Sequence, residues 1–414
     1  MNKKNKSESF YGYIVVAAAF AIVVIGVGGS NSFGVFLKPL LVEFGWTRAT
    51  TAGAFSLAAL VSGSVCIGIG RLTDRFGPRL PLTVSGLFWG LGYLLMSQIN
   101  AIWQLYLFYG VIMGIGYSGF FTPLLSTIAK WFAKKRGTMT GIVLSGIGVG
   151  SLIMPPLTAW LISNYGWRHA STVLGITSLI IIVSAAQFLR RDPQSKGQLP
   201  DGETAVKQQS SNLGVTGFSL QEAMCTRQLW LLGLTMVCLA ISLKAIQVHI
   251  VIHTTGLGIP IASAVTVLAI AGGVNIAGMF VIGTTADRIG NKQALIIALG
   301  VLLASLVWLQ FAKELWMLYL FAVIFGFVWG GAFVPISPMV AELYGMRAHG
   351  VLFGFINLNF AVGSTIGPVL LGYIFDITGS YQLGLLLLSI VSLICLTLAL
   401  LLQPIRKKKV LGIP

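Results

Sequence analysis

The sequence has little charge. Of its 414 residues only 9% are Asp, Glu, Lys or Arg, 56% are hydrophobic, and the mean hydropathy is +0.88. A soluble domain carries about 25% charged residues, because water has to wet its surface. So few charges cannot cover a chain of this length in water. The composition therefore excludes an ordinary soluble protein and indicates that lipid surrounds most of the chain.

The chain also lacks the residue patterns of several catalytic and metal-binding classes. Its four cysteines form no CxxC pair and no disulfide framework. There is no HExxH and no Walker motif, and G-x-S-x-G has only an incomplete match at 28–32. None of the eleven acidic residues lies in the middle of an apolar run. We therefore expect no enzyme activity, no metal, no cofactor and no direct use of ATP.

Long apolar runs are what the sequence has instead. About 20 apolar residues cross ~30 Å of hydrocarbon as a helix. The run from Tyr11 is too long for a signal peptide and shows no cleavage site, so we expect it to be an uncleaved first span. The sequence predicts an all-α integral membrane protein of twelve spans. These are 11–38, 50–71, 79–98, 103–128, 137–162, 169–189, 228–255, 261–283, 293–311, 315–339, 350–375 and 382–403.

The basic residues lie in alternate connections between these spans. Of the 27 Lys and Arg residues, 22 fall on one side, and the positive-inside rule predicts that this side, with both termini, is cytoplasmic. This placement explains the net charge of +16 without a nucleic-acid partner. The one sizeable hydrophilic stretch, 190–227, reads as a cytoplasmic linker between an N-terminal half, 1–189, and a C-terminal half, 228–414.

The two halves repeat each other. The stretch from Gly70 to Arg79 recurs from Gly283 to Lys292, and Asp74 maps to Asp287 at an offset of 213 residues. Three further matches follow in order at nearly the same offset: Gly114 to Pro123 with Gly326 to Pro335, Gly150 with Gly363, and Pro155 with Pro368. The repeat predicts two pseudo-symmetric six-helix halves, with a substrate site at their interface and access that alternates between the two membrane sides.

The repeated element, G-x-x-x-D-R-x-G-x-R/K, resembles the signature loop of the major facilitator superfamily. Within that superfamily, the stretches 10–16 with 32–49, 130–151 and 248–260 are similar to bacterial monocarboxylate transporters and oxalate/formate antiporters. The resemblance covers essentially the whole chain. It implies a monomeric secondary transporter of the cell inner (plasma) membrane whose substrate is a small organic anion, carried with protons or against a counter-anion.

The resemblance also implies a gating role for the repeated loop, which would hold the outward-facing state closed on the cytoplasmic side. A carboxylate here can accept from backbone N–H groups at a helix N-terminus, and the glycines allow close packing and a tight turn. The alternative is a solvated turn that only obeys the charge rule. The candidate gating residues are Gly70, Asp74, Arg75, Gly77, Arg79, Asp287 and Arg288.

Lys244 is the one charged residue deep inside a span. Insertion of a charge at that depth costs roughly 2.5–3.5 kcal/mol, so we expect Lys244 to face a cavity and to bind an anion, with Gln247 near the same face. The alternative is that it snorkels to the interface. Thr255 marks the span end ~16 Å away, which exceeds the easy reach of a lysine.

His249 is the candidate proton carrier, because the pKa of an imidazole lies near neutrality; the alternative is a structural histidine. It lies about 140° around the helix from Lys244, so the two cannot share one wall. His253 lies four residues on, but no third ligand completes a metal site. Five other polar or aromatic residues at membrane depth either line the cavity or bond neighbouring helices. They are Asn31, Tyr117, Asn275, Trp329 and Asn357.

The chain departs from the subfamily at two positions. Gly256 and Met279 stand where the subfamily usually has an aspartate and an arginine, so the usual anion ligand is absent. Lys244 could replace that arginine and keep an anionic substrate such as a monocarboxylate. Alternatively, the substrate is a neutral or amphipathic compound, as in drug efflux. A receptor without transport is disfavoured because no large soluble domain is present.

Overall fold

A computed structural model describes residues 10–202 and 217–403, and all its regular elements are helices. The N-terminal helices are α1 (Gly12–Asn31), α2 (Phe33–Phe44), α3 (Arg48–Phe76), α4 (Arg79–Met96), α5 (Ile102–Leu105), the π-helix η1 (Tyr106–Met113), α6 (Gly114–Tyr117), α7 (Thr122–Trp131) and α8 (Arg136–Phe188). The short 3-10 helices η2 (Pro193–Lys196) and η3 (Pro200–Gly202) follow. The C-terminal helices are α9 (Leu220–Met224), α10 (Arg227–Gly256), α11 (Ile261–Ile289), α12 (Asn291–Phe311), α13 (Leu315–Gly331), α14 (Ile336–Tyr344), α15 (His349–Thr378) and α16 (Gln382–Leu400).

These helices make twelve crossings. Ten described segments are long and apolar enough to span a membrane. One of them, α8, has 53 residues and breaks at Gly166, where the backbone turns to φ 79°, so it crosses twice. The 18-residue α4 is the remaining crossing. The predicted all-α membrane fold is confirmed.

Several predicted boundaries were wrong, because helices continue or break where the apolar pattern gives no sign. The first span does not end at 38 but continues as α2 to Phe44. No loop separates 162 from 169, since one glycine is enough for the change of direction. The predicted span 103–128 contains η1 and an interruption before Thr122. The middle of the predicted linker, 203–216, lies outside the described residues, as do 1–9 and 404–414.

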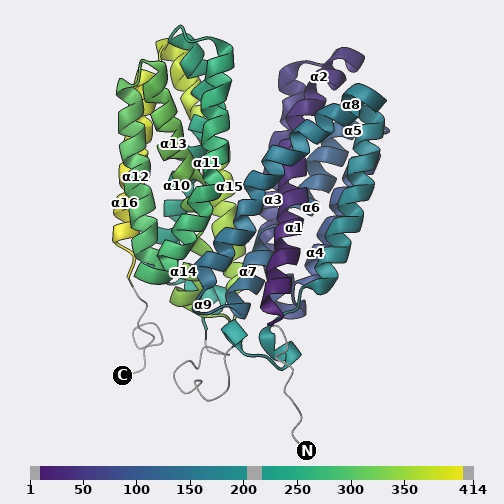
Figure 1. Cartoon of the computed structure of the whole chain (residues 1–414), viewed down its shortest axis with the longest axis vertical. Coiled ribbons are helices and arrows are strands. Elements are labelled where there is room, and N and C mark those ends of the chain that lie inside the picture. The colour runs from purple at the N-terminus through teal and green to yellow at the C-terminus, as the bar shows by residue number, and fades with distance from the viewer. Residues whose placement is uncertain (1–9, 203–216, 404–414) are drawn as a thin grey trace, which may run out of the picture.

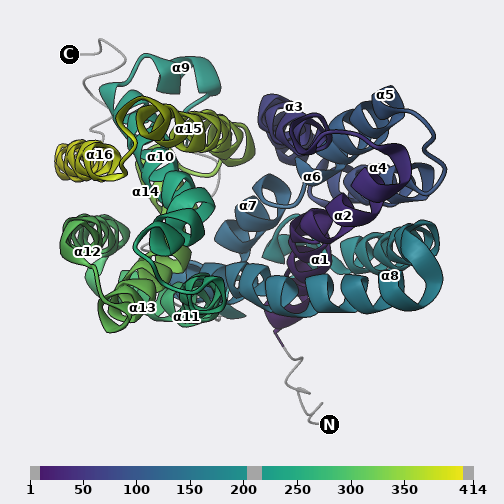
Figure 2. The same ribbon diagram turned by 90° about the horizontal axis from the view of Figure 1, so that it is seen from above.

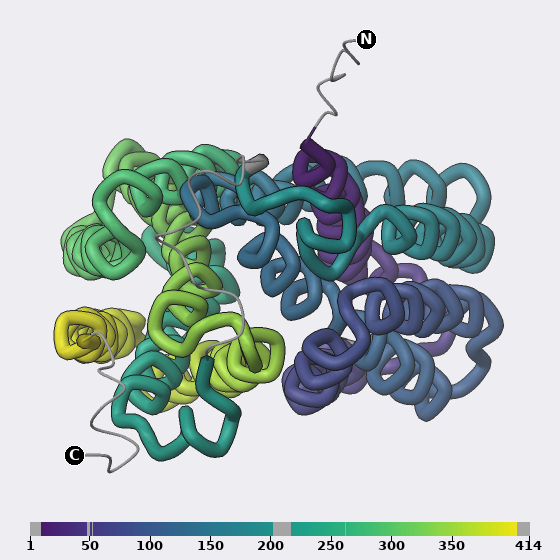
Figure 3. Tube along the Cα trace, turned by 90° about the horizontal axis from the view of Figure 1, so that it is seen from below, coloured from purple at the N-terminus to yellow at the C-terminus, as the bar shows by residue number. Residues whose placement is uncertain are grey.

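The helices form two bundles, one from α1 to α8 and one from α10 to α16 (Figure 1). Seen along the bundles from either end, the two lie side by side and each keeps its own helices together (Figures 2 and 3). Two helix pairs make most of the contact between the bundles: α3 packs against α15, and α8 packs against α11. Each bundle therefore contributes one long helix to each of two contact lines.

Glycines make these two contact lines close. A Cβ on Gly70 would lie 2.3 Å from the Gly350 carbonyl oxygen, and a Cβ on Gly283 would lie 2.6 Å from the Gly137 carbonyl oxygen. The two contacts are equivalent, because Gly70 corresponds to Gly283 and Gly350 corresponds to Gly137 at the offset of 213 residues. Two further contacts repeat in the same way. Gly354 lies against Cys66, and the equivalent Gly141 lies against Met279. Gly63 lies against Ala361, and the equivalent contact joins Ile276 to Gly148. The internal repeat of the sequence is thus repeated in the contacts between the halves.

Contacts between the two halves gather toward one end of the bundles. Along α3 the close contacts run from Gly63 to Asp74, and along α11 they run from Ile276 to Asp287. We call the end that carries Asp74 and Asp287 the aspartate end. The ribbons converge there and lie apart at the opposite end (Figure 1).

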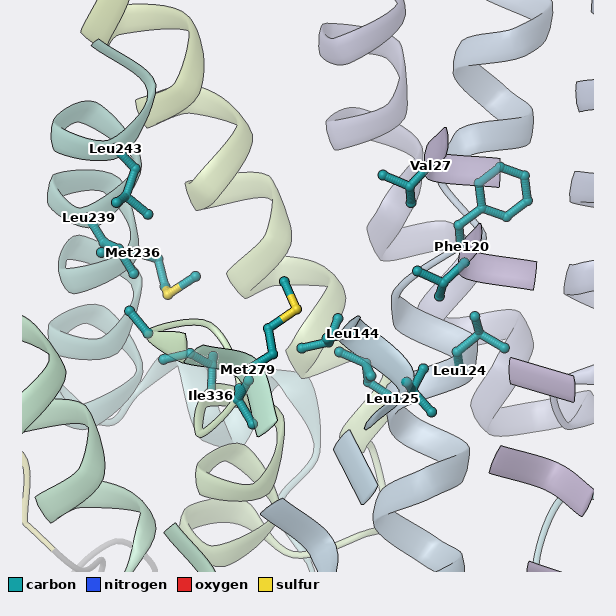
Figure 4. Close-up of a cluster of buried hydrophobic side chains, with 14 of the residues drawn as sticks. Val27, Phe120, Leu124, Leu125, Leu144, Met236, Leu239, Leu243, Met279 and Ile336 are labelled. Carbon is teal, nitrogen blue, oxygen red and sulfur yellow. The ribbon is translucent and has the colours of Figure 1, made fainter. Parts of the chain in front are cut away.

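An apolar layer lies above the aspartate end. Met279 from the C-terminal half and Leu144 and Leu125 from the N-terminal half are at most 3% exposed (Figure 4). Ile336, also fully buried, lies beside Met279 in the same view. These apolar side chains pack between the halves on this side and keep water from the space that they fill.

We predict that Gly70→Ala weakens the contact between α3 and α15. The added methyl would meet backbone atoms of Gly350 and Val351 at 2.3–2.8 Å, so the helices must separate, at a cost of about 1–3 kcal/mol. The melting temperature of the purified protein should fall. The matched control is Gly68→Ala in the same helix, whose Cβ would meet nothing within 4 Å. Equal melting temperatures for both variants would contradict the packing argument.

Candidate functional site

The two repeated aspartates each cap a helix of the opposite half. The Asp74 carboxylate accepts from the backbone N–H groups of Gly350 and Val351 at 2.9 Å each, at the start of α15. The Asp287 carboxylate accepts from Gly137 at 2.6 Å and Thr138 at 2.7 Å, at the start of α8. The N–H donors of the two contacts are related by the offset of 213 residues, and so are the two accepting aspartates.

A helix N-terminus suits a carboxylate for two reasons. Its first N–H groups have no partner inside the helix, and the helix dipole places partial positive charge there. Each aspartate is partly buried, which strengthens its hydrogen bonds relative to bonds in water. The two contacts therefore join the halves at the aspartate end, one in each direction.

The hydrogen bonds and the ring contact of the other loop residues stay within their own half. Arg79 donates to the carbonyl oxygens of Leu189 and Gln187 and ties the start of α4 to the end of α8. Gly77 takes φ 79° to end α3, and the Arg75 guanidinium lies over the Phe76 ring at 5.0 Å. Arg288 is exposed. Gating by the whole loop stays a prediction, and its geometry across the halves rests on the aspartates and the glycines.

Lys244 lies in the interior of α10 and is partly buried. Its ammonium group donates to the Gln247 Oε1 atom at 2.9 Å, and no carboxylate lies within ion-pair distance of it among the described residues. The Gln247 Nε2 group is buried and has no hydrogen-bond partner. The structure thus brings two candidate site residues together and leaves the lysine charge without a counter-charge.

Pseudo-symmetry relates Lys244 to another candidate. Subtracting 213 from its number gives Asn31, which is exposed and donates to the Ser151 Oγ atom at 2.7 Å. The repeat extends to the helices beside them. The Ser151 hydroxyl donates to the Ile147 carbonyl oxygen, and the equivalent Ser364 hydroxyl donates to the Phe360 carbonyl oxygen. Lys244 and Asn31 therefore occupy equivalent faces of α10 and α1. The offset was present in the sequence and would have selected this pair from the other candidates.

Tyr117 and Trp329 form a second equivalent pair at the offset of 212 that relates Gly114 to Gly326. Tyr117 packs against Trp89 and Phe121 with ring centroids 5.9 Å apart in each case. Phe121 in turn lies 6.3 Å from Phe333 of the other half. The rings therefore connect the halves near Tyr117, and Trp329 packs with Phe325 within its own half.

The remaining asparagines are buried. Asn357 is 9% exposed and donates to the Thr122 Oγ1 atom at 3.2 Å, which is a polar contact between the halves. Asn275 is 3% exposed, and its Oδ1 atom has no hydrogen-bond partner. These two residues serve the packing between helices in the present arrangement.

His249 lies apart from Lys244, at the opposite end of the molecule from the aspartates. Its Nε2 atom donates to the Pro368 carbonyl oxygen at 3.0 Å, and its Nδ1 atom lies 3.0 Å from the Tyr381 hydroxyl. The bonds connect α10 to α15 and to the residue before α16. His253 contacts the same tyrosine ring. In the part of the chain that the structure describes, no three His, Cys, Asp or Glu side chains gather to hold a metal ion.

The family model of the Major Facilitator Superfamily matches residues 18–358 and 274–413. The chain belongs to the major facilitator superfamily. Monocarboxylate transporter 13 of Rattus norvegicus is 28% identical over 386 residues, covering 92% of this chain and 86% of that protein. Monocarboxylate transporter 12 of Homo sapiens is 25% identical over 440 residues, covering 98% and 85%. The uncharacterized MFS-type transporter YhjX of Escherichia coli (strain K12) is 26% identical over 327 residues, covering 76% of each.

Solved structures of the superfamily share the fold. A variant of the E. coli fucose:proton symporter FucP superposes with a TM-score of 0.73 at 14% identity, covering 95% of this chain and 100% of that one. FucP in the outward conformation gives 0.71 at 14% identity, covering 95% and 99%. The predicted family, the resemblance to monocarboxylate transporters and the assignment as a transporter rather than an enzyme are confirmed. The chain is a multi-pass protein of the plasma membrane.

We predict that Asp74→Asn opens the aspartate end. The neutral amide accepts weakly and from fewer N–H groups, so the opened state should gain on the order of tenfold in population. The measurement is labelling of Ser337→Cys, in a background without native cysteines, by a maleimide. Ser337 is fully buried, and its hydroxyl approaches the Leu125 carbonyl of the other half at 3.4 Å.

Asp192→Asn is the control, since that carboxylate caps only its own 3-10 helix through Ser195. It removes the same charge without touching a contact between the halves. Labelling that is equally slow in Asp74→Asn and in the unchanged protein would mean that the aspartate contact does not hold this end closed.

Proposed function

We propose that the protein is a secondary active transporter of a small organic anion, a monocarboxylate of the lactate or pyruvate kind. Transport proceeds by alternating access, as proton symport or anion exchange, and the monomer is the working unit. The observation that carries the proposal is that Lys244, inside an apolar span, has no carboxylate partner among the described residues.

The position of Lys244 supports an anion site. It lies 17 residues from the start of α10 and 12 from its end, or roughly 26 and 18 Å along the helix. The hydrogen bond to Gln247 points the side chain along the helix but supplies no negative charge. A bound carboxylate would supply it, and the charge-assisted bond would be stronger than one between neutral groups.

The relatives support the same substrate class. The two named above are called monocarboxylate transporters and match over most of their length. In this chain the subfamily's usual arginine position holds Met279, which is buried against the other half at the Gly141 contact. We therefore propose that Lys244 takes over the binding of the carboxylate, with Asn31, Gln247, Tyr117 and Trp329 as its surroundings. The buried Asn275 and Asn357 are proposed to join the site only as the helices move.

The closed aspartate end supports alternating access. The two aspartate contacts and the apolar layer close the space between the halves at one end, and the orientation predicted from charge makes that end cytoplasmic. We propose that this arrangement is the outward-facing state. Transport then requires both carboxylates to leave their helix N-termini.

The test of the substrate class is uptake into proteoliposomes of a panel of labelled monocarboxylates, with and without an inward proton gradient. We expect uptake of at least one acid and a loss of roughly 30-fold or more in Lys244→Gln, since a charge-assisted pair contributes ~2 kcal/mol or more. Lys244→Arg should retain transport. Lys38→Gln is the control, because that exposed lysine lies on α2, away from the α10 face.

If vesicles with folded protein take up no acid, the anion proposal is wrong. Transport of a neutral or amphipathic compound that is insensitive to Lys244→Gln would then favour the drug-efflux alternative.

We further propose that His249 carries the coupled proton. The neutral ring accepts from the Tyr381 hydroxyl, and the same hydroxyl can turn to accept from the protonated ring, so both states keep their hydrogen bonds. His249→Gln can keep both bonds but cannot carry a proton. We expect exchange transport to stay within about twofold while stimulation by the proton gradient is lost. Stimulation should persist in His253→Gln. Persistent stimulation in His249→Gln would remove His249 from the coupling.

A further inference from the structure

Three arginines line a hollow at the aspartate end. Arg71 and Arg75 come from the last turns of α3, and Arg347 comes from the loop before α15. The hollow measures about 350 Å³, and Ser219 and Leu220 at the start of α9 complete its wall. All three arginines are exposed and none has a carboxylate partner among the described residues. Asp74 also lines the hollow, but its oxygens are bonded to the start of α15.

The pseudo-symmetric position in the other half shows what such a loop binds. There the loop before α8 is Ala133–Lys135, which the offset of 213 relates to Met346–Ala348. The Asp201 carboxylate accepts from the backbone N–H groups of Ala133 and Lys134 at 2.8 Å each and of Lys135 at 3.4 Å. The first copy of the loop is thus occupied by an anion that the chain itself supplies.

The chain accepts an unusual conformation to place this anion. Asp201 is the only residue other than glycine with positive φ, 59°, in the described part of the chain. A non-glycine residue in this region is uncommon and is held there by its surroundings. The carboxylate is therefore a built part of the first copy.

Among the described residues, no carboxylate occupies the second copy of the loop in this way. Gly217 pairs with Gly345 in an isolated antiparallel bridge beside this loop, and a Cβ on Gly217 would lie 3.0 Å from the backbone nitrogen of Arg347. Among the described residues, the backbone N–H groups of Arg347 and Ala348 donate to no acceptor. The positive charge is also greater here, since Arg71 replaces the equivalent Thr284, while Arg75 and Arg347 match Arg288 and Lys134. Three guanidinium groups against the single charge of Asp74 leave the hollow with a net charge of about +2.

We propose that this hollow binds a phosphate group, with the guanidinium groups of Arg71, Arg75 and Arg347 as its ligands. Guanidinium forks match the oxygens of phosphate, and a doubly charged anion balances the hollow. The source is either the headgroup of an anionic phospholipid or free phosphate at this membrane face. Two ligands belong to the N-terminal half and one to the C-terminal half. The bound group therefore stabilises the closed aspartate end, whatever the transported substrate is.

The test uses the purified full-length protein in uncharged detergent at constant ionic strength. One arm titrates inorganic phosphate and the other titrates phosphatidylglycerol against phosphatidylcholine, with melting temperature and calorimetric binding as readouts. We expect saturable binding in at least one arm, and a loss of affinity of about tenfold or more in Arg347→Gln and in Arg75→Gln. Saturation by phosphate identifies a soluble source, and saturation by phosphatidylglycerol alone identifies the lipid headgroup.

The matched controls are Lys134→Gln and Arg288→Gln, which remove the equivalent cations of the first copy and should leave the affinity unchanged. The comparison needs only one of the two arginine variants to be folded, which is shown by an unchanged melting temperature in the absence of ligand. Absence of saturable binding in both arms, or an equal loss of affinity in the controls, would overturn the proposal.

Discussion

The contact between a carboxylate and the N-terminus of a helix from the other half is the interaction on which the arrangement depends. Asp74 bonds α15 and Asp287 bonds α8, so each half holds the other by the same chemistry. The glycines beside them let the helices come close enough for the bonds to form. Because the bonds lie at one end, they close that end and leave the helices at the opposite end free to stand apart.

Duplication provides the frame, and departures from symmetry provide the chemistry. The contacts of α3 with α15 recur between α11 and α8 at one offset, which makes a two-state movement of whole halves possible. Lys244 stands at the position equivalent to Asn31, and Trp329 at the position equivalent to Tyr117. In the proposed function, the single charge of Lys244 on one side of a symmetric frame binds the anion in a fixed direction, whereas a symmetric pair of lysines would repel each other.

The sequence was sufficient for the fold class and for the duplication, because lipid demands long apolar runs and the copied loop keeps its residues. It could not show the break at Gly166 or the continuation into α2, since single glycines and serines inside apolar runs leave hydropathy unchanged. The partners of His249 were also out of reach, because the sequence pattern does not show that its ring meets the carbonyl oxygen of Pro368 on another helix. The Lys244 and Asn31 pair was accessible through the repeat, and the role of these residues awaits transport measurements.

The most direct test of the account is a pair of distances measured by electron–electron resonance in a background without native cysteines. One label pair at Leu80 and Met224 reports the aspartate end, and one at Val42 and Leu257 reports the opposite end; all four side chains are exposed. When both Asp74 and Asp287 are replaced by asparagine, the first distance should lengthen and the second should shorten. Unchanged distances, or lengthening at both ends, would contradict the claim that these two carboxylates hold the halves in one of two reciprocal states.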